Sequence, residues 1–197
     1  LQKEMGIEDN PDLAFNDWVN WGGPGTDVVW ARYYIEHSLH DLYHWAENQG
    51  VKWVDMKPQE GNSVMRWTRP ERSGLGLMTN LITSFREKGG EIVDNTEITK
   101  IKVNKGRAVG LEGVNQSTGE KVDVSCKTVI VTTGGFNSNI DMVLEARPEF
   151  KEFKVMEGSG RGSTGSGHKL VTEVGGYLTH MENVWFYVYA TPDYLYS

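Results

Sequence analysis

The chain has 197 residues, with 27 acidic and 20 basic side chains and a formal net charge of −7 at pH 7. This balance argues against a nucleic-acid-binding protein, which needs a basic surface, and a hydrophobic content of 38% is too high for a disordered acidic segment. The single cysteine, Cys126, excludes an internal disulfide and a cysteine-based zinc cluster, and no apolar run approaches the roughly 18 residues of a membrane-spanning helix.

The first third of the chain is predicted to be helical and rich in aromatic residues. Asn10-Pro11-Asp12 is a helix-start signal, and the glycine-rich residues 20–26 should end that helix. Asp27 is suited to cap a second helix, in which apolar residues recur at helical spacing until Gly50 supplies a left-handed cap. A short strand is expected over residues 51–54, and an irregular loop over residues 58–70.

From residue 73 onward the pattern alternates between helix and strand. Helices are predicted over residues 75–85 and 166–174. The strands at 97–104, 107–115 and 120–125 are joined by short turns, so they should form an antiparallel meander. Residues 128–132, Thr-Val-Ile-Val-Thr, form a β-branched run typical of a strand buried on both faces. Further strands are predicted at residues 91–94 and 185–190.

Glycine is unusually frequent, with 23 residues in 197, about 12% against a usual value of about 7%. Residues 160–165, Gly-Arg-Gly-Ser-Thr-Gly, formally match the dinucleotide-binding pattern, in which backbone amides cradle a pyrophosphate. The stretch before them is charged and does not read as a buried strand. The pattern is therefore weak evidence for a nicotinamide-dinucleotide-binding dehydrogenase, and a flexible glycine loop is the alternative.

Three histidines share one face of the predicted second helix. Imidazoles spaced like those of His37, His40 and His44 can ligate a transition metal. No cysteine and no carboxylate beyond the helix completes the set, so partly packed or solvated histidines are the better interpretation and no metal site is predicted. Cys126 is interpreted as a small strand-end residue rather than a nucleophile, and the chain contains neither a nucleophile elbow nor a P-loop motif.

The β-branched run at residues 128–132 leads directly into Gly134-Gly135. In open α/β sheets, ligands bind at the carboxyl ends of parallel strands, and residues without bulky side chains there allow a ligand to approach the backbone. The junction is therefore a candidate ligand site, although an ordinary strand-to-helix turn would give the same pattern.

This junction and its surroundings resemble the fumarate reductase/succinate dehydrogenase flavoprotein superfamily, which includes soluble fumarate reductases, ketosteroid 1-dehydrogenases and urocanate reductases. Residues 132–136, Thr-Thr-Gly-Gly-Phe, are similar to the family's Ala-Thr-Gly-Gly-Phe, and Asn95-Thr96 and Gly110 precede them in the family's order. Residues 164–167, Thr-Gly-Ser-Gly, are similar to its Thr-Gly-Asp-Gly, and residues 68–76 resemble its loop-helix entry.

The resemblance implies an FAD-dependent oxidoreductase that moves a hydride to or from a carbon–carbon bond next to a carbonyl or carboxylate of a small unsaturated substrate. It implies an α/β fold with an α+β tendency: a partial, Rossmann-like FAD-binding domain with parallel strands at residues 91–94 and 129–132, the antiparallel meander, and the helical first third. The expected segments are residues 1–72, helical and aromatic-rich; residues 73–150, the central part of the FAD-binding domain; and residues 151–197, a glycine-rich loop, a helix and the start of a substrate or capping region.

The resemblance also implies particular cofactor contacts. These are the backbone of Ile98 at the adenine, then Thr132, Thr133 and Gly134 at the ADP part, and Gly165, Ser166 and Gly167 on the flavin side.

Three positions depart from the family. Thr132 stands where the family has an alanine, which is a small change. Ser166 stands where the family has an aspartate, which replaces a carboxylate by a hydroxyl. Tyr187 stands near the place of the substrate-binding histidine of soluble fumarate reductases, and a phenol cannot supply an imidazolium for a carboxylate. A substrate that is bulkier or more apolar than fumarate is therefore expected.

The family's glycine-rich FAD fingerprint is expected before Leu1 and its catalytic arginine after Ser197. The chain is accordingly expected to be an internal fragment that binds FAD weakly or not at all and is inactive alone. A sheet without its central strand has an open edge, so self-association is expected. The alternatives are a nicotinamide-dependent fragment and a non-catalytic interaction module that uses the aromatic residues 18–53. No targeting segment is recognised, and the compartment, cytoplasmic or periplasmic, stays open.

Overall fold

The computed structural model describes residues 1–156 and 160–184. The chain divides into two compact units, Leu1–Ile92 and Val93–Ser197. Each unit has its own buried residues: Ala31, Ala46, Val51 and Met56 in the first, and Ile101, Phe136, Val143 and Leu170 in the second. The strand predicted at residues 185–190 lies outside the described residues.

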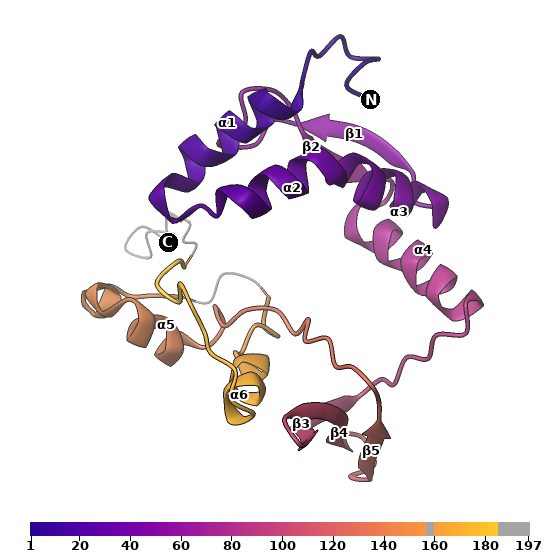
Figure 1. Cartoon of the computed structure of the whole chain (residues 1–197), viewed down its shortest axis with the longest axis vertical. Coiled ribbons are helices and arrows are strands. Elements are labelled where there is room, and N and C mark those ends of the chain that lie inside the picture. The colour runs from indigo at the N-terminus through magenta and orange to yellow at the C-terminus, as the bar shows by residue number, and fades with distance from the viewer. Residues whose placement is uncertain (157–159, 185–197) are drawn as a thin grey trace, which may run out of the picture. The chain divides into compact units, whose positions relative to one another are not determined.

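Two helices that begin at the predicted caps open the first unit (Figure 1). Helix α1 spans Pro11–Gly22, and the side chain of Asn10 accepts the N–H of Leu13 at 2.9 Å. Helix α2 spans Val28–Ser38, and the carboxylate of Asp27 accepts two backbone N–H groups of its first turn at 3.0 Å. These bonds satisfy amides that have no partner inside a helix, so both predicted helix starts are confirmed.

Charge and aromatic contacts hold α1 against α2. The guanidinium of Arg32 on α2 lies 4.1 Å from the ring centroid of Phe15 and 2.8 Å from the carboxylate of Asp12. The rings of Trp18 and Tyr34 lie 5.2 Å apart. The helix pair is therefore held by contacts that run from the first turn of α1 to Trp18.

Helix α2 continues through a wider, π-helical turn at Leu39–His44 into α3, Trp45–Asn48. Gly50 follows with φ +93°, the left-handed conformation expected after the helix. The prediction of a helix that ends near Gly50 is confirmed, whereas the wider turn inside it was not predicted.

A two-stranded antiparallel hairpin and a long helix complete the first unit. Strand β1, Trp53–Lys57, pairs with β2, Trp67–Pro70. The strand predicted at residues 51–54 therefore starts and ends too early. The loop predicted over residues 58–70 is wrong for its last four residues, because they pair with β1 and form β2. Helix α4 spans Ser73–Glu87 and confirms the helix predicted at residues 75–85.

A network around Arg66 joins distant parts of the first unit. Its guanidinium donates two hydrogen bonds of 2.8 Å to the carboxylate of Asp9 and one of 2.6 Å to Asp17 on α1. All three side chains are mostly buried, with 14–18% of their surface exposed. The network fixes the N-terminal segment and α1 to the loop that precedes β2.

The second unit begins with the predicted antiparallel meander. Strands β3 (Thr96–Asn104), β4 (Arg107–Asn115) and β5 (Lys121–Ser125) are adjacent in that order. The β3–β4 turn is Lys105-Gly106, both with positive φ, which suits the twist of a two-residue hairpin. The meander prediction is confirmed.

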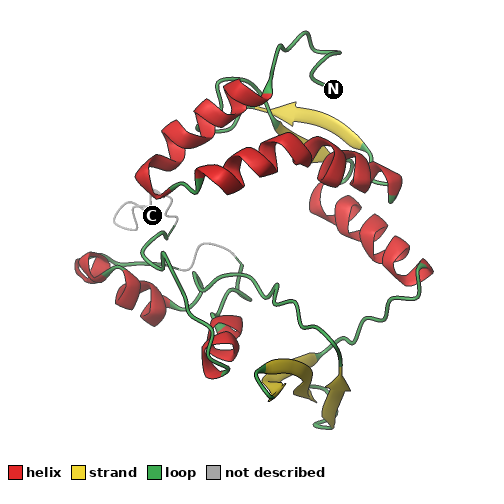
Figure 2. Cartoon of the chain, viewed as in Figure 1, coloured by secondary structure: helices red, strands yellow, loops and turns green. Residues whose placement is uncertain are grey.

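The parallel strands predicted at residues 91–94 and 129–132 are wrong for the described structure. Both sheets are antiparallel, and neither segment pairs with another strand. Figure 2 shows the chain between β5 and α5 as loop. A strand forms only when a neighbouring strand shares its ladder of backbone hydrogen bonds. In the described part of the chain, no other strand lies beside either segment. Ile130 is consequently 82% exposed.

Two short helices follow in the second unit. Helix α5, Ile140–Ala146, was not predicted; the side chain of Asn139 caps it by accepting the N–H of Met142 at 3.2 Å. Helix α6 spans Ser166–Glu173 and confirms the predicted helix at residues 166–174. Among the residues that the structure describes, no helix has the length and apolar character needed to cross a membrane.

Candidate functional site

The two glycine-rich segments of the second unit lie against each other. Backbone hydrogen bonds run from the N–H of Gly165 to the carbonyl of Gly135, 3.0 Å, and from the N–H of Ser138 to the carbonyl of Ser163, 2.9 Å. The side chains of Ser138 and Asn139 add bonds to the carbonyls of Gly160 and Thr164, at 2.7 and 3.2 Å. The sequence marked these segments as separate motifs, and the fold makes them one structure.

Gly165 fixes the start of α6. Its φ is +78°, a conformation that residues with a side chain rarely adopt, and it lies buried. A Cβ here would lie 2.5 Å from the sulfur of Met142 and 3.1 Å from Cβ of Phe136. Only glycine therefore allows α6 to begin this close to α5 and the preceding loop.

Gly167 lets the first turn of α6 rest on the extended segment at residues 131–133. A Cβ at position 167 would overlap the hydroxyl of Thr133 and lie 3.1 Å from Cγ1 of Val131. Any larger residue would push the helix away from this segment.

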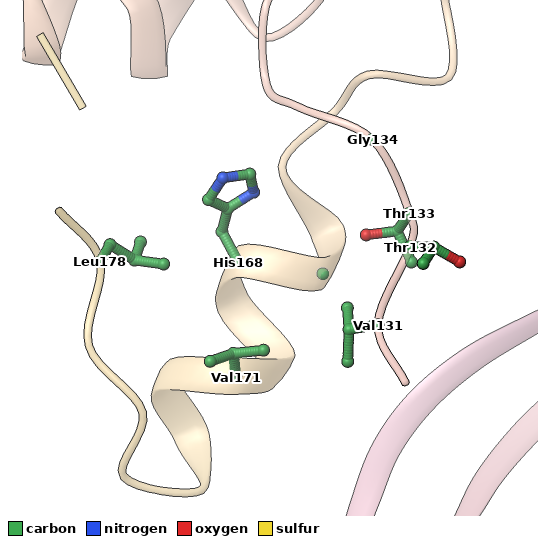
Figure 3. Close-up of a pocket in the computed structure, with 8 residues that line it drawn as sticks. Val131, Thr132, Thr133, Gly134, His168, Val171 and Leu178 are labelled. Carbon is green, nitrogen blue, oxygen red and sulfur yellow. The ribbon is translucent and has the colours of Figure 1, made fainter. Parts of the chain in front are cut away.

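A pocket of about 240 Å³ lies where α6 meets the extended segment. Figure 3 shows Thr132 and Thr133 on the segment and His168 and Val171 on α6. The ring of His168 also meets Phe136 edge to face, with centroids 5.5 Å apart. The residues that line the pocket are Val131, Thr132, Thr133, Gly134, Gly167, His168, Val171 and Leu178.

The polar groups of the pocket suit an electron-rich ligand. The lining offers the hydroxyls of Thr132 and Thr133 and the imidazole of His168, and it contains no carboxylate. The adjoining N-terminus of α6 has no side-chain cap, and the dipole of a helix favours negative charge at that end. The arrangement can hold a polar, anionic group beside an apolar one, since Val131, Val171 and Leu178 form the rest of the wall.

The structure brings most of the candidate cofactor residues together. Thr132, Thr133, Gly134 and Gly167 line the pocket, and Gly165 and Ser166 directly precede it at the start of α6. Ile98 lies in β3 opposite Gly113 of β4 and does not line the pocket. Tyr187 lies outside the described residues.

Sequence reasoning missed His168, Val171 and Leu178. The signal for the first two was present, because positions 168 and 171 are three apart in the predicted helix and so share a face. Leu178 lies beyond the end of α6, and no local pattern links it to the pocket.

The histidine stripe of the first unit does not form a metal centre. Across residues 1–156 and 160–184, no three histidine, cysteine or acidic side chains are placed to hold a metal ion. His37 instead stacks on Tyr33, with ring centroids 4.0 Å apart, and Nδ1 of His44 lies 2.7 Å from the carboxylate of Glu47.

The architecture is that of FAD-dependent oxidoreductases. The chain superposes on the open conformation of a flavocytochrome c3 fumarate reductase with a TM-score of 0.77 and 26% identity, over 88% of this chain and 31% of that one. It superposes on a 3-ketosteroid-Δ4-(5α)-dehydrogenase from Rhodococcus jostii RHA1 with a TM-score of 0.78, over 92% of this chain and 44% of that one. The second likeness, at 21% identity, concerns the fold alone.

Sequence comparison defines the family. Residues 1–194 match the FAD binding domain family, so the chain belongs to it. The chain is 29% identical to urocanate reductase from Eggerthella lenta, over 95% of this chain and 31% of that protein. It is 26% identical to NADH:fumarate oxidoreductase from Klebsiella pneumoniae (strain 342), over 93% of this chain and 20% of that protein. The chain thus spans a fifth to a third of the length of these relatives and corresponds to a fragment of a fumarate reductase-family flavoprotein.

Proposed function

We propose that the protein containing this chain transfers a hydride between FAD and a carbon–carbon bond next to a carbonyl or carboxylate. The observation that carries this proposal is the pocket in which Thr132, Thr133, Gly134 and Gly167 meet. These residues come from the two motifs most similar to the flavoprotein family, and they lie about 34 positions apart in the sequence and side by side in the fold.

The residues of this pocket fit part of an FAD molecule. Gly134 leaves its backbone open to close approach, and the threonine hydroxyls and the start of α6 suit a phosphate or ribityl portion. Cofactor-sized sites usually measure about 300–1,000 Å³, whereas this pocket measures about 240 Å³. The rest of the cofactor site must therefore come from other parts of the protein.

Each candidate residue has a binding role in this proposal. Thr132, Thr133 and Gly134 contact the ADP part, and the backbone of Ile98 contacts the adenine. Gly165, Ser166 and Gly167 form the turn that faces the flavin side. FAD supplies the redox chemistry when bound, because its isoalloxazine ring exchanges a hydride with the substrate. This chain contributes the orientation of the cofactor and the exclusion of water from one side of it.

The substrate is proposed to be bulkier or more apolar than fumarate. Tyr187 supports this, since it stands near the place of a substrate-binding histidine in soluble fumarate reductases. In the complete protein, Tyr187→His should raise kcat/KM for fumarate relative to a cinnamate-like substrate. Equal effects on both substrates would contradict the role of Tyr187.

Flavin retention tests the proposed cofactor site. The complete protein should retain FAD through gel filtration, and the 197-residue chain alone should retain little or none. Thr133→Val in the complete protein should weaken FAD binding, because it replaces a pocket hydroxyl by a methyl group of similar size. Thr128→Val is the matched control, since Thr128 is exposed and does not line the pocket.

Three results would oppose the proposal. These are a complete protein that binds no flavin, equal FAD affinity of the two valine variants, and tight binding of NADH without FAD. The last result would favour the nicotinamide-dependent alternative, to which the turn at residues 160–165 before α6 would then contribute.

A further inference from the structure

A second pocket lies at the hairpin end of the meander, and its lining shares no residue with the first. It measures about 430 Å³. The β3–β4 turn forms one side, and the residues just after β5 form the other. The N–H of Cys126 donates to the carbonyl of Val109 at 3.0 Å, which holds this segment against β4. The lining residues are Asn104, Lys105, Arg107, Ala108, Val109, Cys126 and Lys127.

The lining of this pocket carries three cations and no carboxylate. Lys105, Arg107 and Lys127 contribute the charges. Elsewhere on the same meander, two cations are paired across the strands: Lys100 with Glu112 at 3.7 Å, and Lys102 with Asp123. Within the part of the chain that the structure describes, none of the three pocket cations forms an ion pair with a carboxylate. Although the chain has a net charge of −7, the lining of this pocket therefore carries positive charge that no carboxylate neutralises.

These charges select the chemistry of a ligand. Like charges close together repel, and an anion between them replaces repulsion by attraction. Arg107 offers a planar fork of donors that matches phosphate oxygens, and the lysines add point charges. Ala108 and Val109 place apolar surface in the same pocket, and the volume exceeds what a free phosphate ion needs.

We propose that this pocket binds a phosphate monoester of a small organic molecule. The phosphate lies among Lys105, Arg107 and Lys127, and the organic part contacts Ala108 and Val109. The proposal does not depend on the flavin site, because the two pockets have separate linings.

Cys126 provides a built-in reporter, since it lines the pocket and is the single cysteine of the chain. We would measure the rate at which neutral iodoacetamide alkylates Cys126 in the full chain, with benzyl phosphate, inorganic phosphate or benzyl alcohol present at matched ionic strength. Benzyl phosphate should slow alkylation severalfold and in a saturable way, while benzyl alcohol should have no effect. Isothermal titration calorimetry with benzyl phosphate should give one site per chain.

Charge variants test whether these residues form the site. Arg107→Gln and Lys127→Ser should each weaken benzyl phosphate protection by about tenfold or more, which corresponds to at least 1.4 kcal/mol. Lys121→Ser is the matched control, because Lys121 is an exposed cation of β5 outside the pocket. Circular dichroism spectra and alkylation rates without ligand identify any variant that has lost its fold, and the remaining variant then decides the test.

The outcomes separate the parts of the proposal. Equal protection by sodium chloride, or unchanged protection in both Arg107→Gln and Lys127→Ser, would overturn the anion site. Equal affinity for inorganic phosphate and benzyl phosphate would support the anion site and overturn the contact of an organic group with Ala108 and Val109.

Discussion

Thr133 and Gly167 are in such close contact that no side chain fits between them: a Cβ on Gly167 would overlap the Thr133 hydroxyl. A Cβ at position 167 would also lie 3.1 Å from Cβ of Thr133 and 3.1 Å from Cγ1 of Val131. The pocket proposed to hold part of FAD lies around this contact.

Gly167→Ala should separate α6 from this segment. Alanine favours a helix over glycine by up to about 1 kcal/mol, but overpacking typically costs about 1–3 kcal/mol, so we expect a net loss of stability. Hydrogen exchange should quicken in residues 131–133 and 166–171. Gly162→Ala is the control, since its Cβ would have no atom within 4 Å. A second substitution, Thr133→Ala, should partly restore the stability of Gly167→Ala. Slower exchange in Gly167→Ala than in the unaltered chain would show that the contact is not tight.

Asn139→Ala should loosen α5 and the glycine-rich turn at residues 160–165 at once. The side chain of Asn139 caps α5 through the N–H of Met142 and donates to the carbonyl of Thr164. Loss of a cap costs about 1 kcal/mol, so exchange should quicken in α5 and in residues 160–165 together. Asn137→Ala, at an exposed neighbouring position, should leave both unchanged. Faster exchange in α5 alone would mean that the bond to Thr164 contributes little.

Acid should weaken the first unit through the Arg66 network. Burial raises the pKa of Asp9, but hydrogen bonds from Arg66 and Gln2 outweigh it and leave that pKa below its usual value. The hydrogen bond from Arg66, together with the N–H of Ser63, likewise lowers the pKa of Asp17. Since both pKa values are lower in the folded state, the network stabilises the unit above about pH 4, and this contribution is lost as the pH falls through the folded-state values.

Arg66→Gln should therefore lower the free energy of unfolding at pH 7 by about 1–3 kcal/mol and reduce its dependence on pH below about pH 5. Urea unfolding followed by tryptophan fluorescence reports mainly on the stability of the first unit. Six of the seven tryptophans lie there, at positions 18, 21, 30, 45, 53 and 67. Arg86→Gln is the control, as Arg86 is exposed on α4. Identical pH profiles for the two variants would contradict the role of the network.

Ile130→Lys should reduce self-association of the chain. Ile130 is 82% exposed on an extended segment that pairs with no strand among the described residues. Such segments invite pairing between chains, which a lysine opposes. Light scattering should show a smaller mean mass than for the unaltered chain. Val109→Lys, at a 37% exposed position on β4, which lies between β3 and β5, should leave the mass unchanged. A chain that is monomeric before any substitution would refute the expectation.

Local signals predicted the elements that depend on local interactions. The capping side chains of Asn10 and Asp27 marked two helix starts, and the turn at Lys105-Gly106 marked the meander. The β-branched run at residues 128–132 predicted a buried strand, yet strand formation depends on a partner that sequence periodicity cannot supply. Helix α5 escaped prediction because it has only seven residues and its cap, Asn139, follows closely after the glycine-rich junction.

The sequence predicted most of the residues that form the candidate site, but not that they lie together in the fold. The resemblance singled out Thr132, Thr133, Gly134 and the turn at residues 165–167. Their meeting depends on hydrogen bonds between residues 22 and 25 positions apart, and no local pattern encodes such contacts. The place of Ile98 likewise depends on a distant partner, because it lies in β3 opposite Gly113 of β4.

The bond from the hydroxyl of Ser138 to the carbonyl of Gly160 joins two residues 22 positions apart and so closes a loop of the chain that contains α5. The entropy cost of closing such a loop grows only slowly with its length. Residues added to this loop directly after Ala146, the last residue of α5, should therefore leave the pocket walls in place. This position is accordingly suited to the insertion of a tag or a sensor domain.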